Sequence, residues 1–322
     1  MAMKTFLDAL REAQIEEMAR DPTVFVMGQD TTSNIFGGAT GMVEAFGLER
    51  VRDTPIAEAG MTGVGIGAAM VGMRPILNFG MSTFMFPAMD QIFSMAAKSR
   101  YLYGGQARVP MVLRGGMIYG AGNAAQHSDR PYSVFMNMPG LKIIVPSSAY
   151  DAKGLMKTAI RDDDPVLCFE DSALWTSRSD IPDEEYLIPF GVAEVKREGT
   201  DCTVVAIGAM VPVALKAAEQ AAAQGRSLEV VDPRTLAPLD IGRILESVEK
   251  TGRLVVVDAA HERCSAASEI AASVASDGFW SLRAPIARVT TPMTHVPFSA
   301  ALEEGLYPNV DKILAAVEGT FA

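Results

Sequence analysis

The chain has 322 residues, enough for about two domains, and its 49% hydrophobic and 21% charged residues are typical of a folded globular protein. No apolar run approaches the roughly 20 residues that a membrane span needs. The formal net charge is −11 and no basic stripe is present, which argues against nucleic-acid binding. An acidic surface favours solubility and would also suit docking onto a basic protein partner.

The N-terminal segment is predicted to be a folded helix. Residues 5–20 are amphipathic with acids in every turn, which does not match a signal peptide. The three cysteines, Cys168, Cys202 and Cys264, are scattered, and two of them lie in strand-like runs. This usage predicts reduced thiols in a cytoplasmic protein rather than disulfides or a metal cage.

Short apolar runs alternate with helical patterns through residue 170. The runs lie at 23–28, 75–79, 109–115, 141–146 and 165–170. The helical patterns lie at 5–20, 62–73, 84–103 and 149–162. This alternation predicts a parallel sheet covered by helices on both faces.

A polar stretch with prolines and clustered acids, SDIPDEEY, interrupts the pattern between 171 and 200. The alternation restarts at CTVVAIG (202–208) and continues to a last helix at 310–318. We therefore predict an α/β protein with two domains built on parallel or mixed sheets. The first domain covers 1–180, a linker 181–200, and a smaller second domain 201–322.

Two glycine motifs fail the context test for dinucleotide binding. GAGNAA (120–125) does not directly join a strand to a helix, and GVGIGA (63–68) precedes a strand instead of following one. We interpret 63–68 as close helix packing and 120–125 as a flexible loop. No phosphate-binding loop is found in the chain.

Of the three histidines, His127 is the best candidate for proton transfer. It lies in the polar loop NAAQHSDRPYS after a predicted strand, where α/β proteins place ligands. The alternative is a surface histidine without a role. His261 and His295 lie in loops of the second domain, and we expect them to serve packing or subunit contacts.

Glu58 in DTPIAEAG allows two interpretations. A carboxylate near a helix N-terminus is favoured by the helix dipole, by about 0.3–1 kcal/mol, and needs no further role. Its small apolar neighbours would instead desolvate it and favour a shared proton, as needed to engage a ring nitrogen. Further along, Phe84 or Phe86 could face a cleft and stack on a planar cofactor, although such spacing is usually core.

Long stretches of the chain resemble one family in the right order. They include RVRDTPIAEAGMTGVGIGAAMVGMRPI, MDQIFSMAAKSRYLYGGQ, AAQHS, PGLKIIVPSSAYDAKGLMKTAIRDDDPVL, VVDPRTLAPLD and THVPFSAALEEGLYPNVDKILAAV. Together they resemble the beta subunit of the thiamine diphosphate-dependent first component of 2-oxo acid dehydrogenase complexes. Within that family, IPDEEYLIPFG and ERCSAASEIAASVA look most like acetoin dehydrogenase; pyruvate and branched-chain enzymes are similar as well.

The resemblance assigns roles to individual residues. It implies that Glu58 hydrogen-bonds a pyrimidine nitrogen of thiamine diphosphate and promotes its activation. It places the ring of Phe84 on the pyrimidine, with Ile56 and Gln29 also at the cofactor. It puts His127 in the active-site channel, for proton transfer and acylation of a lipoyl group. A site for a monovalent cation such as K⁺, built largely from backbone carbonyls in some relatives, maps more weakly to Met111, Ala159, Ile160, Asp162 and Asp164.

The resemblance also implies partners. In this family the diphosphate and Mg²⁺ are held by a separate alpha subunit through a Gly-Asp-Gly motif, which is not found here. The expected assembly is an α2β2 heterotetramer of transketolase-type fold, active only with its alpha subunit. The second domain is expected to contact a second beta subunit and the lipoyl-bearing dihydrolipoyl acyltransferase.

The chain departs from the family pattern near the expected site. Relatives have an acid where this chain has Gln29, and the loop 31–41 and the strand end NFGMSTF also differ, so substrate preference stays open. One alternative is a two-chain transketolase-type ketol transferase, which would need exposed basic residues; Arg114 and Arg130 are the loop candidates. Another is a partner protein that kept the fold without the chemistry.

Overall fold

The fold is described from a computed structural model, covering residues 2–35, 37–118, 120 and 122–322. The chain divides into two compact units, each of which is described by itself. The first comprises Met1–Ile118 and Val134–Phe190. The second comprises Tyr119–Ser133 and Gly191–Ala322, so a short internal segment belongs with the C-terminal half.

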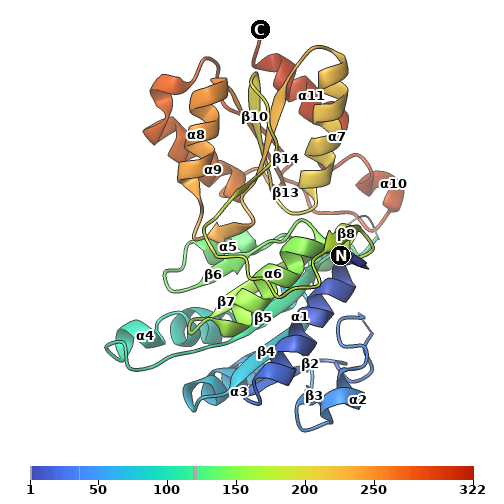
Figure 1. The fold of residues 1–322 in the computed structure, drawn as a ribbon, viewed down its shortest axis with the longest axis vertical. Helices are drawn as coiled ribbons and strands as arrows, with labels where there is room; N and C mark the ends of the chain where they lie inside the picture. The colour runs from blue at the N-terminus through green and yellow to red at the C-terminus, as the bar shows by residue number, and fades with distance from the viewer. Residues whose placement is uncertain (1, 36, 119, 121) are drawn as a thin grey trace. The chain divides into compact units, whose positions relative to one another are not determined.

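The first unit is built on a parallel sheet with the strand order β6-β7-β5-β4-β2-β3 (Figure 1). Its strands are β2 (Val24–Gly28), β3 (Val51–Asp53), β4 (Arg74–Met81), β5 (Val112–Met117), β6 (Lys142–Ile144) and β7 (Val166–Asp171). Every residue of β2, β5 and β7 is buried, as expected for parallel strands covered on both faces. A separate antiparallel pair joins β1 (Ala2–Thr5) to β8 (Arg178–Ile181).

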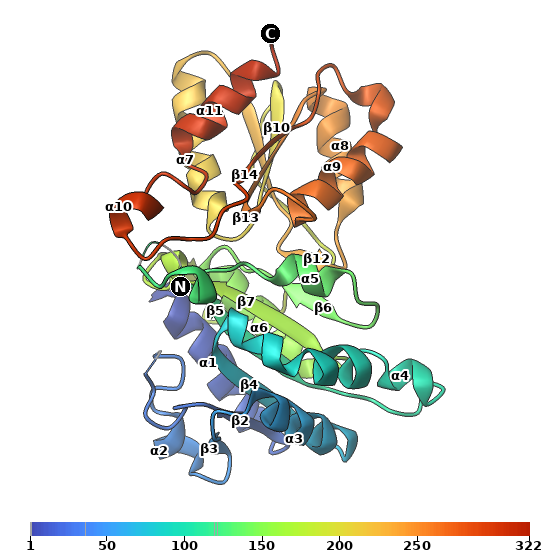
Figure 2. The same ribbon diagram turned by 180° about the vertical axis from the view of Figure 1, so that it is seen from behind.

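Helices cover both faces of this sheet. Helices α1 (Phe6–Arg20) and α6 (Ala149–Arg161) lie on one face (Figure 1), and α3 (Glu58–Met70) with the helical segment 82–102 lies on the other (Figure 2). Further short helices of the unit are α2 (Met42–Phe46) and α5 (Tyr132–Met136), which begins in the second unit's segment.

Two predicted helices differ in detail. The helix expected at 62–73 begins earlier, at Glu58. The helix expected at 84–103 is instead a 3₁₀ segment η1 (Ser82–Ala88), a π segment η2 (Gln91–Ala96) and a short α4 (Ser99–Leu102). Pro87 lies inside η1 and has no N–H to donate, which prevents a regular α-helix there.

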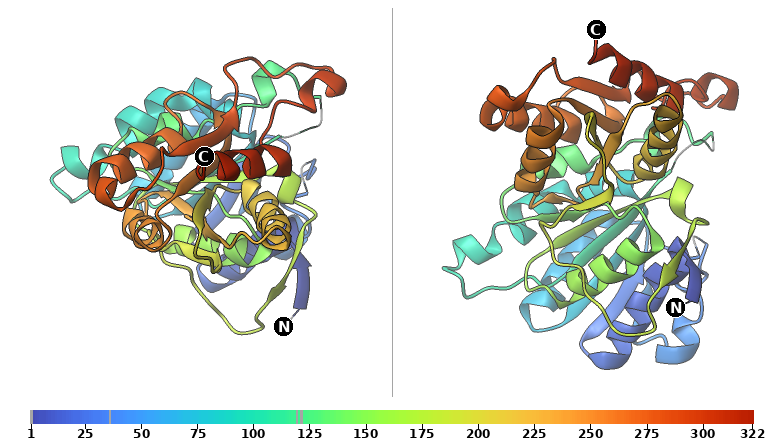
Figure 3. Two further views of the ribbon diagram at one scale, coloured as in Figure 1. Left: turned by 90° about the horizontal axis from the view of Figure 1, so that it is seen from above. Right: turned by 45° about the horizontal axis from the view of Figure 1, so that its top comes forward.

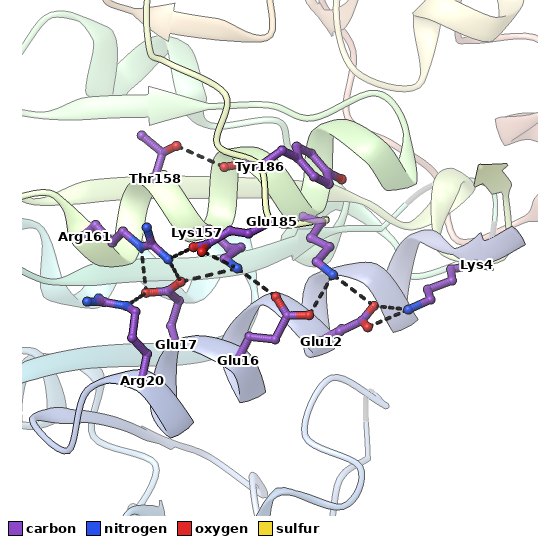
Figure 4. Close-up of polar contacts among 12 residues, drawn as sticks. Lys4, Glu12, Glu16, Glu17, Arg20, Lys157, Thr158, Arg161, Glu185 and Tyr186 are labelled. Atoms are coloured by element: carbon purple, nitrogen blue, oxygen red, sulfur yellow. Dashed lines mark hydrogen bonds and ion pairs between the residues drawn. The ribbon is translucent and has the colours of Figure 1, made fainter. Parts of the chain in front are cut away.

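Ion pairs fasten α1 to α6 (Figure 4). The Glu17 carboxylate is fully buried. It accepts hydrogen bonds from Nε and Nη2 of Arg161, at 2.9 and 2.6 Å, and from Nε of Arg20 at 2.7 Å. The preceding residue, Glu16, accepts hydrogen bonds from Lys153 and Lys157 at 2.7 and 2.8 Å. A buried carboxylate is tolerated when charged donors satisfy its oxygens, as they do at Glu17.

The second unit, which is seen from above in the left view of Figure 3, contains a five-stranded sheet. Its strand order is β14-β13-β10-β11-β9, and all neighbours are parallel except for β9. The strands are β9 (Glu194–Arg197), β10 (Cys202–Ala206), β11 (Leu228–Asp232), β13 (Leu254–His261) and β14 (Ala287–Thr291); β12 (Thr235–Ala237) is a further short strand. Helices α7 and α11 lie on one face and α8 and α9 on the other (Figure 1). Their bounds are α7 (Met210–Ala223), α8 (Ile241–Thr251), α9 (Ala266–Asp277) and α11 (Val310–Gly319). The unit also contains the short helices α10 (Ala300–Glu303), η3 (Ala125–His127) and η5 (Phe279–Ser281). A further short helix, η4 (Ser172–Leu174), belongs to the first unit.

The predicted α/β class with parallel and mixed sheets is confirmed. Cys168 and Cys202 are buried on β7 and β10, whereas Cys264 is exposed in a loop, and all three are free thiols. Among the described residues, no helix has the length and apolar character needed to cross a membrane.

Candidate active site

Three neighbouring strands of the first unit end at one edge of its sheet. The last residue of β2, Gly28, lies opposite Asp53 of β3 and Asn78 of β4. The carboxyl ends of parallel strands are where open α/β sheets bind ligands. Gln29, Glu58 and Phe84 follow these three strand ends, so the topology gathers residues that are far apart in sequence.

Gly28 is needed for the close approach of β2 and β4. A Cβ built on Gly28 would lie 2.2 Å from the carbonyl oxygen of Asn78, closer than real atoms approach. The backbone also ties β2 to the segment after β3, because the Thr54 N–H donates to the Gly28 carbonyl at 2.9 Å. The absence of a side chain therefore lets the strand ends converge at this edge.

Glu58 is the first residue of α3 and is half-buried. Its carbonyl accepts a hydrogen bond from the Thr62 hydroxyl at 2.7 Å. Its carboxylate Oε1 accepts one from Gln29 Nε2 at 3.0 Å. Position at a helix start agrees with the simple dipole interpretation, but the bond to Gln29 adds a partner from the turn after β2, which a helix-start carboxylate does not need.

The loop after β2 is held by a second carboxylate. Asp53 accepts the Thr32 N–H at 2.8 Å and a short hydrogen bond from the Thr32 hydroxyl. Partial burial acts to raise the pKa of Asp53, but these hydrogen bonds outweigh it and lower that pKa. The charged form of Asp53 therefore fixes the residues that directly follow Gln29.

Phe84 and Ile56 border the same strand ends. Phe84 lies half-buried in η1, which directly follows β4 and contacts α3. Ile56 lies between β3 and α3 and is 83% exposed. Phe86, the other aromatic considered for stacking, is 37% exposed on η1.

Buried hydroxyls near the strand ends test whether these residues suit a polar cofactor. The hydroxyls of Thr31, Ser82 and Thr83 are buried, and within the described part of the chain they have no hydrogen-bond partner. An unsatisfied buried hydroxyl is costly, so such groups generally meet water or a ligand. A half-buried acid, an amide, an aromatic ring and these hydroxyls together fit a flat heterocycle with ring nitrogens.

His127 belongs to the second unit. It ends the short η3 and is half-buried, with its backbone N–H 3.4 Å from the Ala124 carbonyl. The loop that carries it follows β5, as the sequence predicts. His261 Nε2 donates a hydrogen bond to the Thr294 carbonyl at 2.9 Å, and His295 is exposed.

The residues predicted to hold a monovalent cation lie at the end of α6 and beside β5. Arg74 Nη1 donates to the carbonyls of Ile160 and Asp162, at 3.1 and 2.8 Å. The Met111 carbonyl accepts the Val166 N–H at 3.0 Å, and the Ala159 carbonyl accepts the Asp162 N–H at 3.3 Å. The side chain of Asp162 binds Lys142, and that of Asp164 binds Arg100. Each carbonyl oxygen keeps a second lone pair. Separately, the described residues contain no group of three or more His, Cys, Asp or Glu side chains that could hold a metal.

The two arginines suggested for sugar-phosphate binding are not exposed loop residues. Arg114 lies within β5, is 5% exposed, and binds Glu170 through two parallel hydrogen bonds of 2.6 and 2.8 Å. Arg130 is 6% exposed and lies over the Tyr307 ring, 5.1 Å from its centroid. Both guanidinium groups therefore serve internal contacts.

Comparisons with known proteins identify the two domains and the fold. Residues 2–176 match the pyrimidine binding domain of transketolase, and residues 191–313 match the transketolase C-terminal domain. A solved split-gene transketolase, described as an inactive beta4 tetramer, has the same fold, with a TM-score of 0.79, 23% identity, and coverage of 98% of this chain and 97% of that one.

Curated relatives are similar over nearly the whole chain. The beta subunit of acetoin:2,6-dichlorophenolindophenol oxidoreductase from Bacillus subtilis is 44% identical, over 96% of this chain and 94% of the relative. The 2-oxoisovalerate dehydrogenase beta subunit of the same organism is 43% identical, over 98% of each. The pyruvate dehydrogenase E1 beta subunit of Rhizobium meliloti is 41% identical, over 99% of this chain and 70% of the relative.

The predicted resemblance is thereby confirmed, and the dehydrogenase interpretation is favoured over a ketol transferase. With two transketolase-type domains and full-length similarity to three kinds of dehydrogenase subunit, the chain belongs to the beta subunits of the thiamine diphosphate-dependent first components of 2-oxo acid and acetoin dehydrogenase complexes.

Proposed function

We propose that this chain is the beta subunit of an enzyme that cleaves acetoin or decarboxylates a pyruvate-like 2-oxo acid and passes the acyl group to a lipoyl acyltransferase. The observation that carries the proposal is the hydrogen bond between Gln29 and Glu58 at the carboxyl ends of adjacent parallel strands. It pairs an orienting amide with an acid at the edge where this fold binds ligands.

The residues of the first unit would bind and orient the pyrimidine half of thiamine diphosphate. When bound, this cofactor supplies a nucleophilic carbon for attack on the substrate carbonyl. Glu58 would hold a proton at its carboxylate for a ring nitrogen of the cofactor, and Gln29 would fix the orientation of that carboxylate. Phe84 offers an aromatic face to the ring, and Ile56 offers apolar surface that excludes water.

His127 would move protons during acyl transfer to the lipoyl group. An imidazole is suited to this role because it gains and loses a proton near neutral pH. Its position on a loop after a parallel strand supports the assignment.

The rest of the cofactor is assigned to a partner. We infer that an alpha subunit holds the diphosphate and Mg²⁺, in an α2β2 assembly that also binds the lipoyl-bearing acyltransferase. Large apolar side chains exposed on the first unit support such contacts, because extended apolar surface marks interaction sites. They include Ile56, Val64, Val71, Tyr101 and Leu102, at 83%, 63%, 81%, 89% and 64% exposure.

Occupation of the monovalent cation site stays a prediction. K⁺ at the carbonyl oxygens of residues 111, 159, 160, 162 and 164 would use their second lone pairs beside Arg74. Melting temperatures in KCl, NaCl and choline chloride at equal ionic strength test it. We expect a rise that is selective for K⁺; equal values in all three salts would contradict the site.

The experiment that tests the proposed function replaces Glu58 by Gln in the chain co-purified with its alpha subunit. Glu58→Gln is expected to lower turnover of acetoin and 2-oxo acids at least a hundredfold, because the amide cannot share the bridging proton. Glu44→Gln is the matched control, since Glu44 is an exposed acid in the first turn of α2. Undiminished turnover in Glu58→Gln would show that Glu58 has no role in cofactor activation and is a simple helix-start carboxylate.

The same preparation separates the alternatives. Acetoin, pyruvate and branched-chain 2-oxo acids are compared as substrates, with a lipoyl-bearing acyltransferase as acceptor. Ketol transfer from a sugar phosphate without acyltransferase binding would favour a transketolase-type enzyme. A complex that binds the acyltransferase but turns over none of these substrates would favour a non-catalytic partner.

A further inference from the structure

The loop that carries His127 adopts backbone conformations that need stabilising contacts from neighbouring residues. Gly120 and Gly122 have φ of +65° and +63°. Ala124 has φ +60° and ψ −173°, a region that side-chain-bearing residues rarely enter. A Cβ on Gly122 would lie 3.0 Å from the Phe298 carbonyl, so the loop runs close against the C-terminal segment. Strained backbone of this kind persists only where surrounding groups hold it.

The group that holds the start of this loop is the carboxylate of Glu303. Its Oε1 accepts the Gly120 N–H at 3.0 Å, and its Oε2 accepts the Gly122 N–H at 3.2 Å. Tyr307 donates its hydroxyl to Oε1 at 3.0 Å. Glu303 is 2% exposed and lies at the end of α10, in red in Figure 2. A buried carboxylate needs such donors, and amides that converge on an anion form a charge-assisted clamp.

The same C-terminal segment also holds the far end of the loop. Arg130 lies over the ring of Tyr307, 5.1 Å from its centroid, and its Nη1 donates to the Ser128 carbonyl at 3.2 Å. Burial raises the pKa of Tyr307, and the hydrogen bond to Glu303 raises it too, against the nearby Arg130. The phenol therefore stays a donor to Glu303 throughout the physiological range. His127 lies between two points that are both fixed by residues 303–307.

We propose that Glu303 is a positioning residue for His127, acting through the N–H groups of Gly120 and Gly122. The carboxylate holds the entry to the loop, Tyr307 links that clamp to Arg130 at the exit, and the intervening turn presents the imidazole. The effect on turnover rests on the role proposed above for His127, whereas the clamp itself does not.

The first arm of the test measures amide hydrogen exchange in the purified full-length chain. Glu303→Gln replaces one acceptor oxygen by an NH₂ group that opposes an amide N–H, and it removes the charge. Exchange at Gly120 and Gly122 is expected to speed up about ten- to a hundredfold, the equivalent of losing a hydrogen bond to a charged group. Glu304→Gln is the matched control, because Glu304 directly follows Glu303 and its side chain is exposed. Unchanged exchange in Glu303→Gln overturns the proposal.

The second arm measures turnover of the complex with the alpha subunit, using either a lipoyl acceptor or an artificial dye acceptor. Glu303→Gln is expected to lower kcat with the lipoyl acceptor about tenfold or more. The KM for the substrate is expected to change by less than about twofold. Turnover with the dye is expected to fall less, because the lipoyl step depends on the placement of His127. Glu304→Gln is expected to leave both unchanged. A general loss of activity, equal for both acceptors, would indicate a structural role only and overturn the proposal.

His127→Ala separates the two ideas. If it leaves lipoyl-dependent turnover unchanged, the proposed role of His127 fails, while the exchange arm still decides whether the clamp exists. If His127→Ala lowers turnover but Glu303→Gln does not, the positioning inference fails alone. If Glu303→Gln does not fold, Tyr307→Phe replaces it in both arms. This variant keeps both amide hydrogen bonds to Glu303, so smaller changes in exchange and turnover, in the same direction, are expected. Unchanged exchange and turnover in Tyr307→Phe would overturn the proposal.

Discussion

At the scale of single residues, the pair of Gln29 and Glu58 is the most informative contact. The sequence raises Gln29 as a departure from the expected family pattern, and the structure shows that its amide donates to Glu58 at 3.0 Å. An amide at this distance orients the carboxylate without adding a second negative charge beside it. The departure is therefore compatible with the role proposed for Glu58.

Removal of this amide is expected to weaken activity without unfolding the chain. Gln29→Ala should lower kcat/KM of the reconstituted enzyme about tenfold, the equivalent of about 1.4 kcal/mol for one charge-assisted hydrogen bond. The urea midpoint should stay the same, because Glu58 is only half-buried. Gln224→Ala, at the exposed C-cap of α7, is the control. An unchanged kcat/KM would show that Gln29 does not orient Glu58.

At the scale of elements, the attachment of α1 to α6 depends on charge (Figure 4). Burial acts to raise the pKa of Glu16, but hydrogen bonds from Lys153 and Lys157 outweigh it and lower that pKa below the usual 4.5. A carboxyl whose pKa is lowered on folding stabilises the protein above its unfolded-state pKa. That contribution is lost as the pH falls through the lower, folded-state value.

Replacement of Glu16 should remove this pH dependence. The free energy of unfolding of Glu16→Gln is expected to fall below that of the unmodified chain at pH 7, and the gap should close as the pH falls below 4.5. Urea unfolding at several pH values measures it. Glu246→Gln, which breaks the exposed pair with Arg243, should change the free energy by less than about 0.5 kcal/mol. A gap that is constant with pH would contradict the charge-based attachment.

Helix α3 contains glycines in two different environments. A Cβ on Gly63 would meet nothing within 4 Å, whereas one on Gly65 would lie 3.0 and 3.1 Å from the two methyl groups of Leu77. The sequence motif GVGIGA predicts close helix packing for the whole stretch. Only the three-dimensional structure shows that Gly65 provides it, and that Gly63 lies on the exposed side of the isolated chain.

Alanine substitutions should separate these two glycines. Gly63→Ala is expected to stabilise the isolated chain by about 0.5–1 kcal/mol, because alanine loses less backbone entropy in a helix. Gly65→Ala should be about 1–2 kcal/mol less stable than Gly63→Ala, since Leu77 must shift. Urea unfolding of the two variants decides this; equal stabilities would contradict the packing assigned to Gly65.

At the scale of the whole molecule, the chain path is less simple than a division into two consecutive halves. Residues 120 and 122–133 follow β5 in sequence but belong to the second unit. Tyr132 from this segment donates a short hydrogen bond to the fully buried Asp258 of β13. Asp258 also accepts the N–H groups of Ala260 and Ala267, at 2.9 and 3.2 Å. No pattern around Tyr132 predicts this contact, because its partner lies 126 residues away.

Loss of this bond should destabilise the protein in a pH-dependent way. Burial raises the pKa of Asp258, and the Tyr132 hydroxyl counteracts this by favouring the ionised form. Tyr132→Phe should therefore cost about 1.5–3 kcal/mol at pH 7 and less at pH 4, where the carboxyl is closer to neutral. Tyr101→Phe, 89% exposed, is the control. Unfolding free energies at the two pH values measure this, and a cost that is larger at pH 4 would contradict the assignment.

The sequence by itself determined the alternating strands and helices, the family and the candidate residues Glu58, Phe84 and His127. These follow from local patterns: apolar periodicity reports burial, and long motifs carry the resemblance. Only the tertiary structure decided that Gln29 binds Glu58, that Arg114 and Arg130 are internal, and that Glu303 holds the loop of His127. The physical reason is distance along the chain, since a hydrogen bond between residues 29 or 183 positions apart leaves no local pattern and depends on strand order and the path of the backbone.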